Sequence, residues 1–156
     1  MHTIRRAAPR DIPRILQLLV QVDLVHHRIR PDLFKGPATK YSAEELRMIL
    51  AQDSTPVFVS VDESDQVQGY AFCVVREQGD QLLTELKTLY IDDICVDEAA
   101  RGQHIGTDLY EHVCAYARGL GCYNVTLNVW TGNDAAQSFY ENLGMKPQKI
   151  CMETIL

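Results

Sequence analysis

Two neighbouring stretches of this 156-residue chain carry groups that could do chemistry on a small substrate. The first is a pair of carboxylates, Asp92 and Asp93, in the middle of an apolar, β-branched run with the pattern of a strand. The second is the turn Arg101–Gly106, which follows that run. Carboxylates in an apolar strand are costly to bury without a purpose, and an active-site cleft supplies one. The alternative is that one aspartate caps a backbone group and the other lies at a solvated edge.

The turn has the composition of an anion site at the start of a helix. Gly102 and Gly106 favour a turn, and Ile105 opens an apolar repeat of three and four residues that continues to Leu120. The first N–H groups of a helix have no intrahelical acceptor, and the helix dipole is positive there. We therefore expect the backbone of this turn to bind phosphate.

A mixed sheet with helices on its faces must position these groups. Pro9 and Asp11 are typical of a helix start, and Ser42–Glu45 matches a capping box. The pattern predicts a mixed α/β fold (α+β mixed) with a mostly antiparallel central sheet, in the order β-α-α-β-β-β-α-β-α-β. The expected strands are residues 2–6, 57–61, 67–76, a run ending at 96, 125–130 and 149–154, and the expected helices begin near residues 9, 42, 105 and 135.

Composition narrows the class of protein. The length predicts a single domain over residues 1–156, and 46% apolar with 23% charged residues is typical of a globular chain. A net charge of −6 argues against a nucleic-acid partner. The five cysteines are widely spaced and predict no metal site. No apolar run has the length of a membrane span and no signal core is visible, so we expect no membrane partner and a cytoplasmic location.

The turn and a second segment together resemble the GNAT superfamily of acyl-CoA N-acyltransferases. Arg101–Gly106 is similar to that family's R/Q-x-x-G-x-G/A pyrophosphate loop, although His104 stands where the family usually has glycine. Asn133–Met145, which contains Tyr140, is similar to its N-x-x-A-x-x-[LF]-Y-x-x-x-G-[FM] segment. The resemblance covers roughly residues 84–146, and it implies the GNAT fold.

The resemblance also implies acetyl-CoA as cosubstrate, with no metal. In the family, strand N–H groups before the loop bind the thioester and pantetheine, and the loop binds the diphosphate. The residues at these positions, with the helix-start asparagine and the tyrosine, are Ile94, Cys95, Val96, Arg101, Gly102, Gln103, His104, Ile105, Gly106, Thr107, Asn133 and Tyr140.

The catalytic groups implied are an acid and a base. Tyr140 matches the tyrosine that stands near the coenzyme sulfur, where a phenol protonated at neutral pH can donate to the leaving thiolate. Asp92 or Asp93 would accept the proton of the amine. In a regular strand Asp92 shares a face with Tyr90, Ile94 and Val96, and Asp93 shares the other with Ile91 and Cys95, so only one should point at the thioester. The sequence leaves the choice open.

The acceptor is expected to be a primary amine on a small cationic molecule such as a polyamine. Asp92 and Asp93 just before Ile94–Val96, followed by Arg101 and later by Phe139 and Tyr140, also resemble the small polyamine acetyltransferases. The acidic chain agrees with a cationic acceptor. Asn128 stands where the branch that acetylates ribosomal-protein N-termini often has glutamate, and this difference argues against a protein N-terminus as acceptor. Family members often pair, so a homodimer is an expected state. The residues expected to bind the acceptor are His26, His27, Phe34, Asp92 and Asn128.

Other functions must be weighed against acetyl transfer to a small amine. A non-catalytic acyl-CoA-binding module would keep the loop without turnover. Within the enzyme class, the acceptor could instead be an aminoglycoside, an amino acid, or a protein lysine or N-terminus. A dinucleotide-binding βαβ unit is excluded by the glycine spacing and by the antiparallel strands before the loop.

Overall fold

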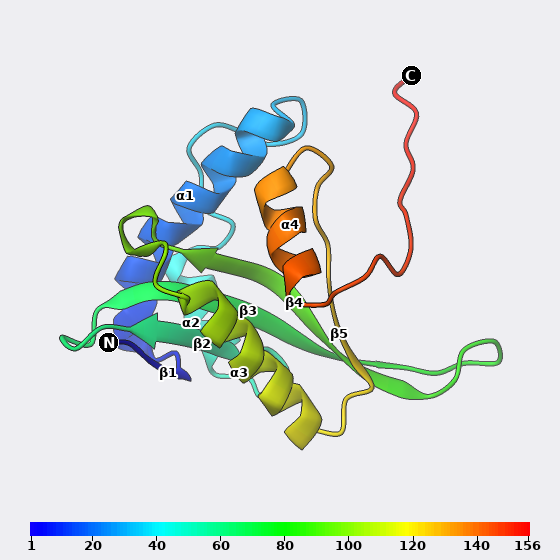
Figure 1. Cartoon of the computed structure of the whole chain (residues 1–156), viewed down its shortest axis with the longest axis horizontal. Coiled ribbons are helices and arrows are strands. Elements are labelled where there is room, and N and C mark those ends of the chain that lie inside the picture. Colours follow the sequence, from blue (N-terminus) through cyan, green and yellow to red (C-terminus); the bar gives the residue numbers. More distant parts are fainter.

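A five-stranded sheet runs through the molecule in the computed structural model, which describes residues 1–156 (Figure 1). The strand order is β1-β2-β3-β4-β5; β1 to β4 pair with one another in antiparallel fashion, and β5 pairs with β4 in parallel. The strands are β1 (Thr3–Arg6), β2 (Val57–Val61), β3 (Val67–Gln78), β4 (Leu86–Val96) and β5 (Asn124–Leu127). The helices are α1 (Ile12–Ile29), α2 (Ala43–Leu50), α3 (Ile105–Gly119) and α4 (Asp134–Asn142), with short 3-10 turns at Pro9–Asp11 and Glu98–Ala100.

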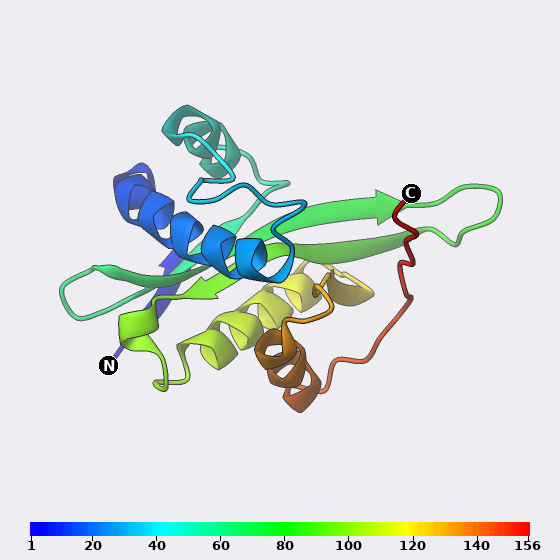
Figure 2. The same ribbon diagram turned by 90° about the horizontal axis from the view of Figure 1, so that it is seen from above.

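Helices cover both faces of the sheet, and each face has its own apolar core. Figure 2 shows α1 and α2 on one face and α3 and α4 on the other. Ile15 and Leu46 are fully buried in the first core, and Leu109 and Val113 are fully buried in the second. Strand alternation divides the sheet side chains between the two cores. The mixed α/β fold predicted from the sequence is confirmed.

Local signals in the sequence set the helix starts. The Ser42 hydroxyl accepts a hydrogen bond from the N–H of Glu45 at 3.1 Å, and the Glu45 carboxylate accepts one from the N–H of Ser42 at 3.3 Å. This reciprocal capping box was predicted, and it fixes the first turn of α2. The buried Asp11 carboxylate, paired with Arg5 at 2.8 Å, lies directly before α1.

Replacing Ser42 by alanine should lower the free energy of unfolding by about 1 kcal/mol, because the N–H of Glu45 in the first turn of α2 loses its side-chain acceptor. Chemical denaturation of the full chain measures this. Ser64→Ala, in the exposed β2–β3 turn, is the control and should change stability by less than about 0.5 kcal/mol. Equal effects of the two substitutions would contradict the capping role.

A bulge interrupts the alternation of β4. Phe72 of β3 pairs with Asp93, whereas the next residue, Cys73, pairs with Ile91, so Asp92 is the extra residue on β4. An inserted residue reverses the side-chain alternation beyond it. Accordingly, Ile91 packs in the core under α3, whereas Cys95 packs in the core under α1.

The two parallel strands separate beyond the bulge. β5 pairs with β4 only from Thr88 to Ile91, and the pairing ends there (Figure 1). The half of β4 from Asp92 to Val96 therefore has no neighbour on its β5 side. The sequence predicted strand through residue 130, but β5 ends at Leu127.

The strand expected at residues 149–154 is not formed. Residues 146–156 are extended but make no ladder, and all of them are exposed. The alternating pattern gives this segment strand propensity, but a strand also needs a partner with free backbone groups.

None of the helices has the length and apolar character needed to span a bilayer.

Candidate active site

The bulge brings both aspartates to the same face of the sheet. Asp92 contacts Tyr41 from the segment between α1 and α2, and Asp93 contacts Tyr70, which is buried in the core under α1. The expectation that they face opposite sides is therefore wrong, because it assumed a regular strand. The expected grouping of Asp92 with Ile94 and Val96 is wrong for the same reason: these two residues pack against the α3 core.

Asp93 has the electrostatics of a general base. Burial raises the pKa of its carboxyl group to about 6, although the Tyr70 hydroxyl opposes this by donating a hydrogen bond to Oδ2 at 2.6 Å. The nearby charge of Lys40 also lowers this pKa, whereas that of Asp92 raises it. A carboxylate with a pKa just below neutral is ionised at pH 7 and holds a proton better than an ordinary aspartate.

Asp92 is held by two donors. Its Oδ2 accepts a hydrogen bond from the Tyr41 hydroxyl at 2.8 Å and lies 2.8 Å from Nζ of Lys40. Burial and the bond to Asp92 raise the pKa of Tyr41 well above its ordinary value, so it remains a donor. Asp92 therefore suits orientation and attraction of a cation more than proton transfer.

Tyr70→Phe should raise the midpoint of the pH–rate profile by roughly one pH unit, because Asp93 loses the hydrogen bond that favours its charged form. The measurement is kcat/KM with acetyl-CoA and an acceptor amine from pH 5 to 8. Tyr41→Phe is the matched control, since it removes the same kind of bond from Asp92. A larger displacement in Tyr41→Phe than in Tyr70→Phe would count against Asp93 as the titrating group.

Tyr140 is buried in α4 with 9% of its surface exposed, and its hydroxyl has no hydrogen-bond partner within the chain. Burial raises the pKa of this phenol well above its ordinary value, and the charge of Asp93 adds to the effect. Tyr140 is therefore protonated at neutral pH and lies within electrostatic range of the candidate base. A candidate acid and a candidate base with separated pKa values thus lie in one region of the molecule.

The predicted phosphate turn is open to solvent at the start of α3. Arg101, Gly102, Gln103 and His104 are exposed, whereas Ile105 is buried and anchors the helix. The helix begins at Ile105, so the N–H groups of its first turn, including those of Gly106 and Thr107, have no acceptor within the helix. These donors and the positive helix end fit a diphosphate.

Backbone geometry explains two positions of this turn. His104 has φ of +60°, in the left-handed region that glycine adopts without strain, which accounts for the glycine usual in the family. At Gly106 a Cβ would lie 3.1 Å from the Phe139 ring of α4. The small residue thus allows α4, which carries Tyr140, to pack closely on the start of α3.

Backbone donors of β4 face the gap left by β5. The N–H of Asp97 bonds to the carbonyl of Gln68 on β3 at 2.8 Å, so by antiparallel alternation those of Ile94 and Val96 point away from β3. They face the side where no strand follows and could bind a thioester carbonyl or pantetheine amides. Cys95 is no candidate nucleophile, because burial raises the pKa of its thiol to about 12.

An aromatic wall lies near the end of α1. The Phe34 ring is 5.0 Å from that of His26 and 5.4 Å from that of Trp130, centroid to centroid. Burial lowers the pKa of His26, which favours its neutral form. His27 instead bonds through Nδ1 to the carbonyl of Phe34 at 2.7 Å, which fits a role in shaping the loop.

The two predicted asparagines have local partners. Asn133 caps α4, because its side-chain oxygen accepts a hydrogen bond from the N–H of Ala136 at 3.3 Å. Asn128 is exposed and donates to the Tyr90 hydroxyl at 3.2 Å. Their roles toward coenzyme and acceptor stay predictions.

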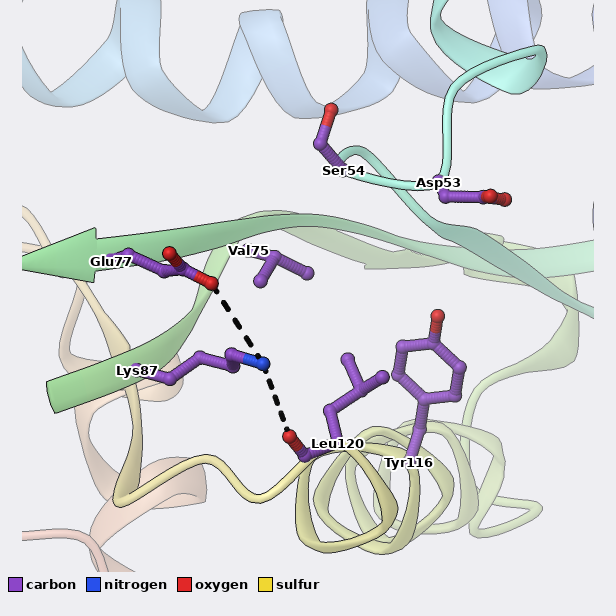
Figure 3. A pocket seen from close by; sticks show the side chains of 7 residues that line it. All are labelled: Asp53, Ser54, Val75, Glu77, Lys87, Tyr116 and Leu120. Atoms are coloured by element: carbon purple, nitrogen blue, oxygen red, sulfur yellow. Dashed lines mark hydrogen bonds and ion pairs between the residues drawn. The ribbon is translucent and has the colours of Figure 1, made fainter.

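A separate hollow of about 650 Å³ lies at the far end of α3 (Figure 3). Lys87 stands in it, paired with Glu77 at 3.8 Å and donating to the carbonyl of Leu120 at 3.3 Å. Its lining shares no residue with the phosphate turn, the two aspartates or Tyr140. It is therefore not the candidate active site.

Comparison with known proteins agrees with the fold and identifies the family. Residues 22–145 match the acetyltransferase (GNAT) family, whose members use acetyl-CoA as cosubstrate. The chain belongs to this family. The class of protein that the fold and site define is thus an acetyl-CoA-dependent acyltransferase.

The individual relatives match only over part of their length or at low identity, so they define the class less sharply than the family match does. Glucosamine 6-phosphate N-acetyltransferase of Arabidopsis thaliana is 33% identical over 66 residues, which are 42% of each chain, and that of Trypanosoma brucei brucei is 35% identical over 57 residues, 36% of this chain and 37% of that protein. The matched part thus spans about two fifths of these relatives. A solved variant of the BH1408 protein of Bacillus halodurans is similar over 99% of both chains, with a TM-score of 0.94 and 30% identity. The solved Arabidopsis enzyme, at a TM-score of 0.74 and 21% identity over 99% of this chain and 98% of that one, is similar in fold alone.

Two contributors to the site were missed from the sequence. Tyr70 and Lys40 contact the aspartates, but neither lies in a motif. The sequence signal for Tyr70 is its polar hydroxyl in an otherwise apolar strand. Pairing β3 with β4 with one bulged residue would have placed Tyr70 opposite Cys95, next to Asp93. Lys40 lies in an irregular loop and gave no signal.

Proposed function

We propose that this protein transfers an acetyl group from acetyl-CoA to a primary amine of a small cationic molecule such as a polyamine. The observation that carries the proposal is the bulge, which turns Asp92 and Asp93 toward one face of the sheet. Two carboxylates on one face attract a cation, and they differ in environment enough to divide the work. The net charge of −6 favours the approach of such a substrate.

In the proposed reaction the turn at residues 101–107 binds the coenzyme diphosphate, and Asn133 adds a side-chain contact. The N–H groups of Ile94 and Val96 bind the thioester carbonyl and the pantetheine amides in the gap between β4 and β5. Acetyl-CoA supplies the thioester. Asp93, ionised at pH 7, takes the proton of the attacking amine, and Tyr140 gives its proton to the departing sulfur. Asp92, fixed by Tyr41 and Lys40, orients the amine.

A phosphorylated amino sugar is the second candidate acceptor. Lys40 lies beside Asp92, and Arg76 stacks 3.8 Å from the centre of the Tyr90 ring on the same strand pair. These cations could bind a phosphate while the carboxylates bind the amine. The names of the Arabidopsis and Trypanosoma relatives point the same way.

A screen of acceptors separates these functions. Thiol release from acetyl-CoA is measured with spermidine, glucosamine 6-phosphate, an aminoglycoside, lysine and a peptide with a free N-terminus. The proposal predicts the highest kcat/KM for the polyamine, and Asp92→Asn should raise its KM by roughly tenfold without changing the KM for acetyl-CoA. Turnover of glucosamine 6-phosphate alone would replace the polyamine assignment, and coenzyme binding without any turnover would indicate a binding module.

A further inference from the structure

Lys40 occupies the place in which the proposed function puts the amine of the substrate. Its Nζ lies 2.8 Å from Oδ2 of Asp92, the carboxylate proposed to orient the acceptor. Burial raises the pKa of Asp93, the proposed base, and the charge of Lys40 opposes this effect, so the ammonium group acts on both carboxylates. A primary amine of the chain itself thus lies where an acceptor amine is expected.

The neighbouring residues fix the backbone at Lys40. The Tyr41 hydroxyl donates to the same carboxylate oxygen of Asp92 at 2.8 Å, and its ring packs on Phe72 of β3 with 5.6 Å between the centroids. Ser42 then opens α2 through its capping box. This segment lies over the sheet between α1 and α2 (Figure 2). The fold therefore places the Lys40 side chain beside the aspartates.

The side chain of Lys40 keeps its own freedom to move. It is 48% exposed, and an ion pair this open to water does little to hold two side chains together. Four methylene groups separate the ammonium from the backbone, so Nζ can shift from Asp92 toward the adjacent Asp93. The bulge in β4 puts both carboxylates on one face, which keeps this movement short.

No other lysine has this position. Lys87 pairs with Glu77 in the separate hollow at the far end of α3. The remaining three of the five lysines are exposed and bond to neither aspartate: Lys35, Lys146 and Lys149. The chain thus contains one lysine at the site and four that serve as internal controls.

We propose that Lys40 is a self-acetylation site, to which each chain transfers the acetyl group of its own bound acetyl-CoA when no acceptor is present. This inference rests on the proposed acetyl transfer and uses the same groups. A role of Lys40 as a structural clamp also accounts for its ion pair with Asp92, but such a clamp would not be modified.

The chemistry follows that proposed for a free amine. Asp93 takes one proton from the ammonium of Lys40, and the lone pair of Nζ attacks the thioester carbonyl. The C–S bond breaks, and the sulfur takes the proton of Tyr140. The surplus proton on the new amide nitrogen restores Tyr140, and Asp93 releases its proton to water. The products are free coenzyme A and a neutral acetyl-lysine, which no longer pairs with Asp92.

Mass spectrometry of the intact chain and of its peptides tests the proposal. Starting from unmodified wild-type chain, incubation with acetyl-CoA and no acceptor should add one acetyl group at Lys40. This modification should be at least roughly tenfold faster than at any other lysine, because an amine held at the site needs no encounter. The rate per chain should stay the same over an about tenfold range of protein concentration, as expected for transfer within one chain.

Three variants control the measurement. Lys40→Arg keeps a cation beside Asp92 and should not gain the fast acetyl group. Lys35→Arg removes an exposed lysine of the same segment and should leave acetylation of Lys40 at the wild-type rate. Asp93→Asn should lose the fast reaction, because the proton of the amine has no acceptor.

The results that would overturn the proposal are specific. Acetylation of Lys40 no faster than that of Lys35, or equally fast in Asp93→Asn, would mean uncatalysed transfer. A rate that rises with protein concentration would mean transfer between chains. Thiol release with spermidine, measured on the same samples, separates the two proposals. Turnover of spermidine with unmodified Lys40 would overturn self-acetylation alone, whereas modified Lys40 without turnover of spermidine would overturn the polyamine acceptor alone.

Discussion

Tyr140→Phe should lower kcat by roughly 100-fold to 1,000-fold while leaving the KM for acetyl-CoA within about twofold of wild type. The substitution removes one oxygen from a buried ring, so packing is kept and only the proton donor is lost. The raised pKa of this phenol makes it a donor at every pH in which the enzyme is assayed. Steady-state thiol release with saturating amine measures the effect.

The control for this substitution is Tyr110→Phe. Tyr110 is close enough to Tyr140 to contribute to its electrostatics, and burial raises its own pKa to about 12. Losing this second phenol should change kcat by less than about twofold, since it has no assigned proton to give. An unchanged kcat in Tyr140→Phe would remove the acid assignment, and equal losses in both variants would point to packing.

The second large effect is expected at Asp93. Asp93→Asn should lower kcat/KM by roughly 100-fold or more and abolish the rise in rate centred near pH 6. Asp92→Asn should keep a rise in this pH range, because Asp93 remains to titrate. Profiles of kcat/KM from pH 5 to 8 for both variants distinguish the two aspartates. A wild-type rise that persists in Asp93→Asn would contradict its role as base.

The Asp93→Asn variant, although less active, should be more stable than wild type at neutral pH. Burial raises the pKa of Asp93 to about 6 from an ordinary value near 4, so the folded state favours its protonated form. That contribution to stability is present below about pH 4 and is lost as the pH rises through 6. Above pH 7 the free energy of unfolding of the neutral Asp93→Asn variant should therefore be about 2 kcal/mol higher than that of wild type. Denaturation at pH 4.5 and 7.5 measures it; a variant less stable at pH 7.5 would mean that the charge is stabilised in the fold.

Features encoded locally could be predicted from the sequence. The capping box at Ser42, the meander of β2, β3 and β4, and the turn before α3 each depend on residues within a few positions of one another. The position of glycines and the change of hydrophobic period were sufficient to order these elements. The fold class follows from such signals, whereas the family was inferred from the resemblance of residues 101–106 and 133–145 to its motifs.

Features that depend on how the strands pair could not be predicted from the sequence. Asp92 is a strand residue by any local measure, and only its register against β3 makes it a bulge and turns both aspartates the same way. The bond from Tyr70 to Asp93 depends on that register. The tail shows the same limit, since residues 149–154 have strand propensity but no partner strand within the chain.

The central claim is that the turn at residues 101–106 binds the coenzyme and so delivers its sulfur to Tyr140 and Asp93. Titration calorimetry of the wild-type chain with acetyl-CoA tests it most directly. The account predicts saturable binding of one acetyl-CoA per chain. The absence of heat and of saturation across concentrations from micromolar to millimolar would contradict it.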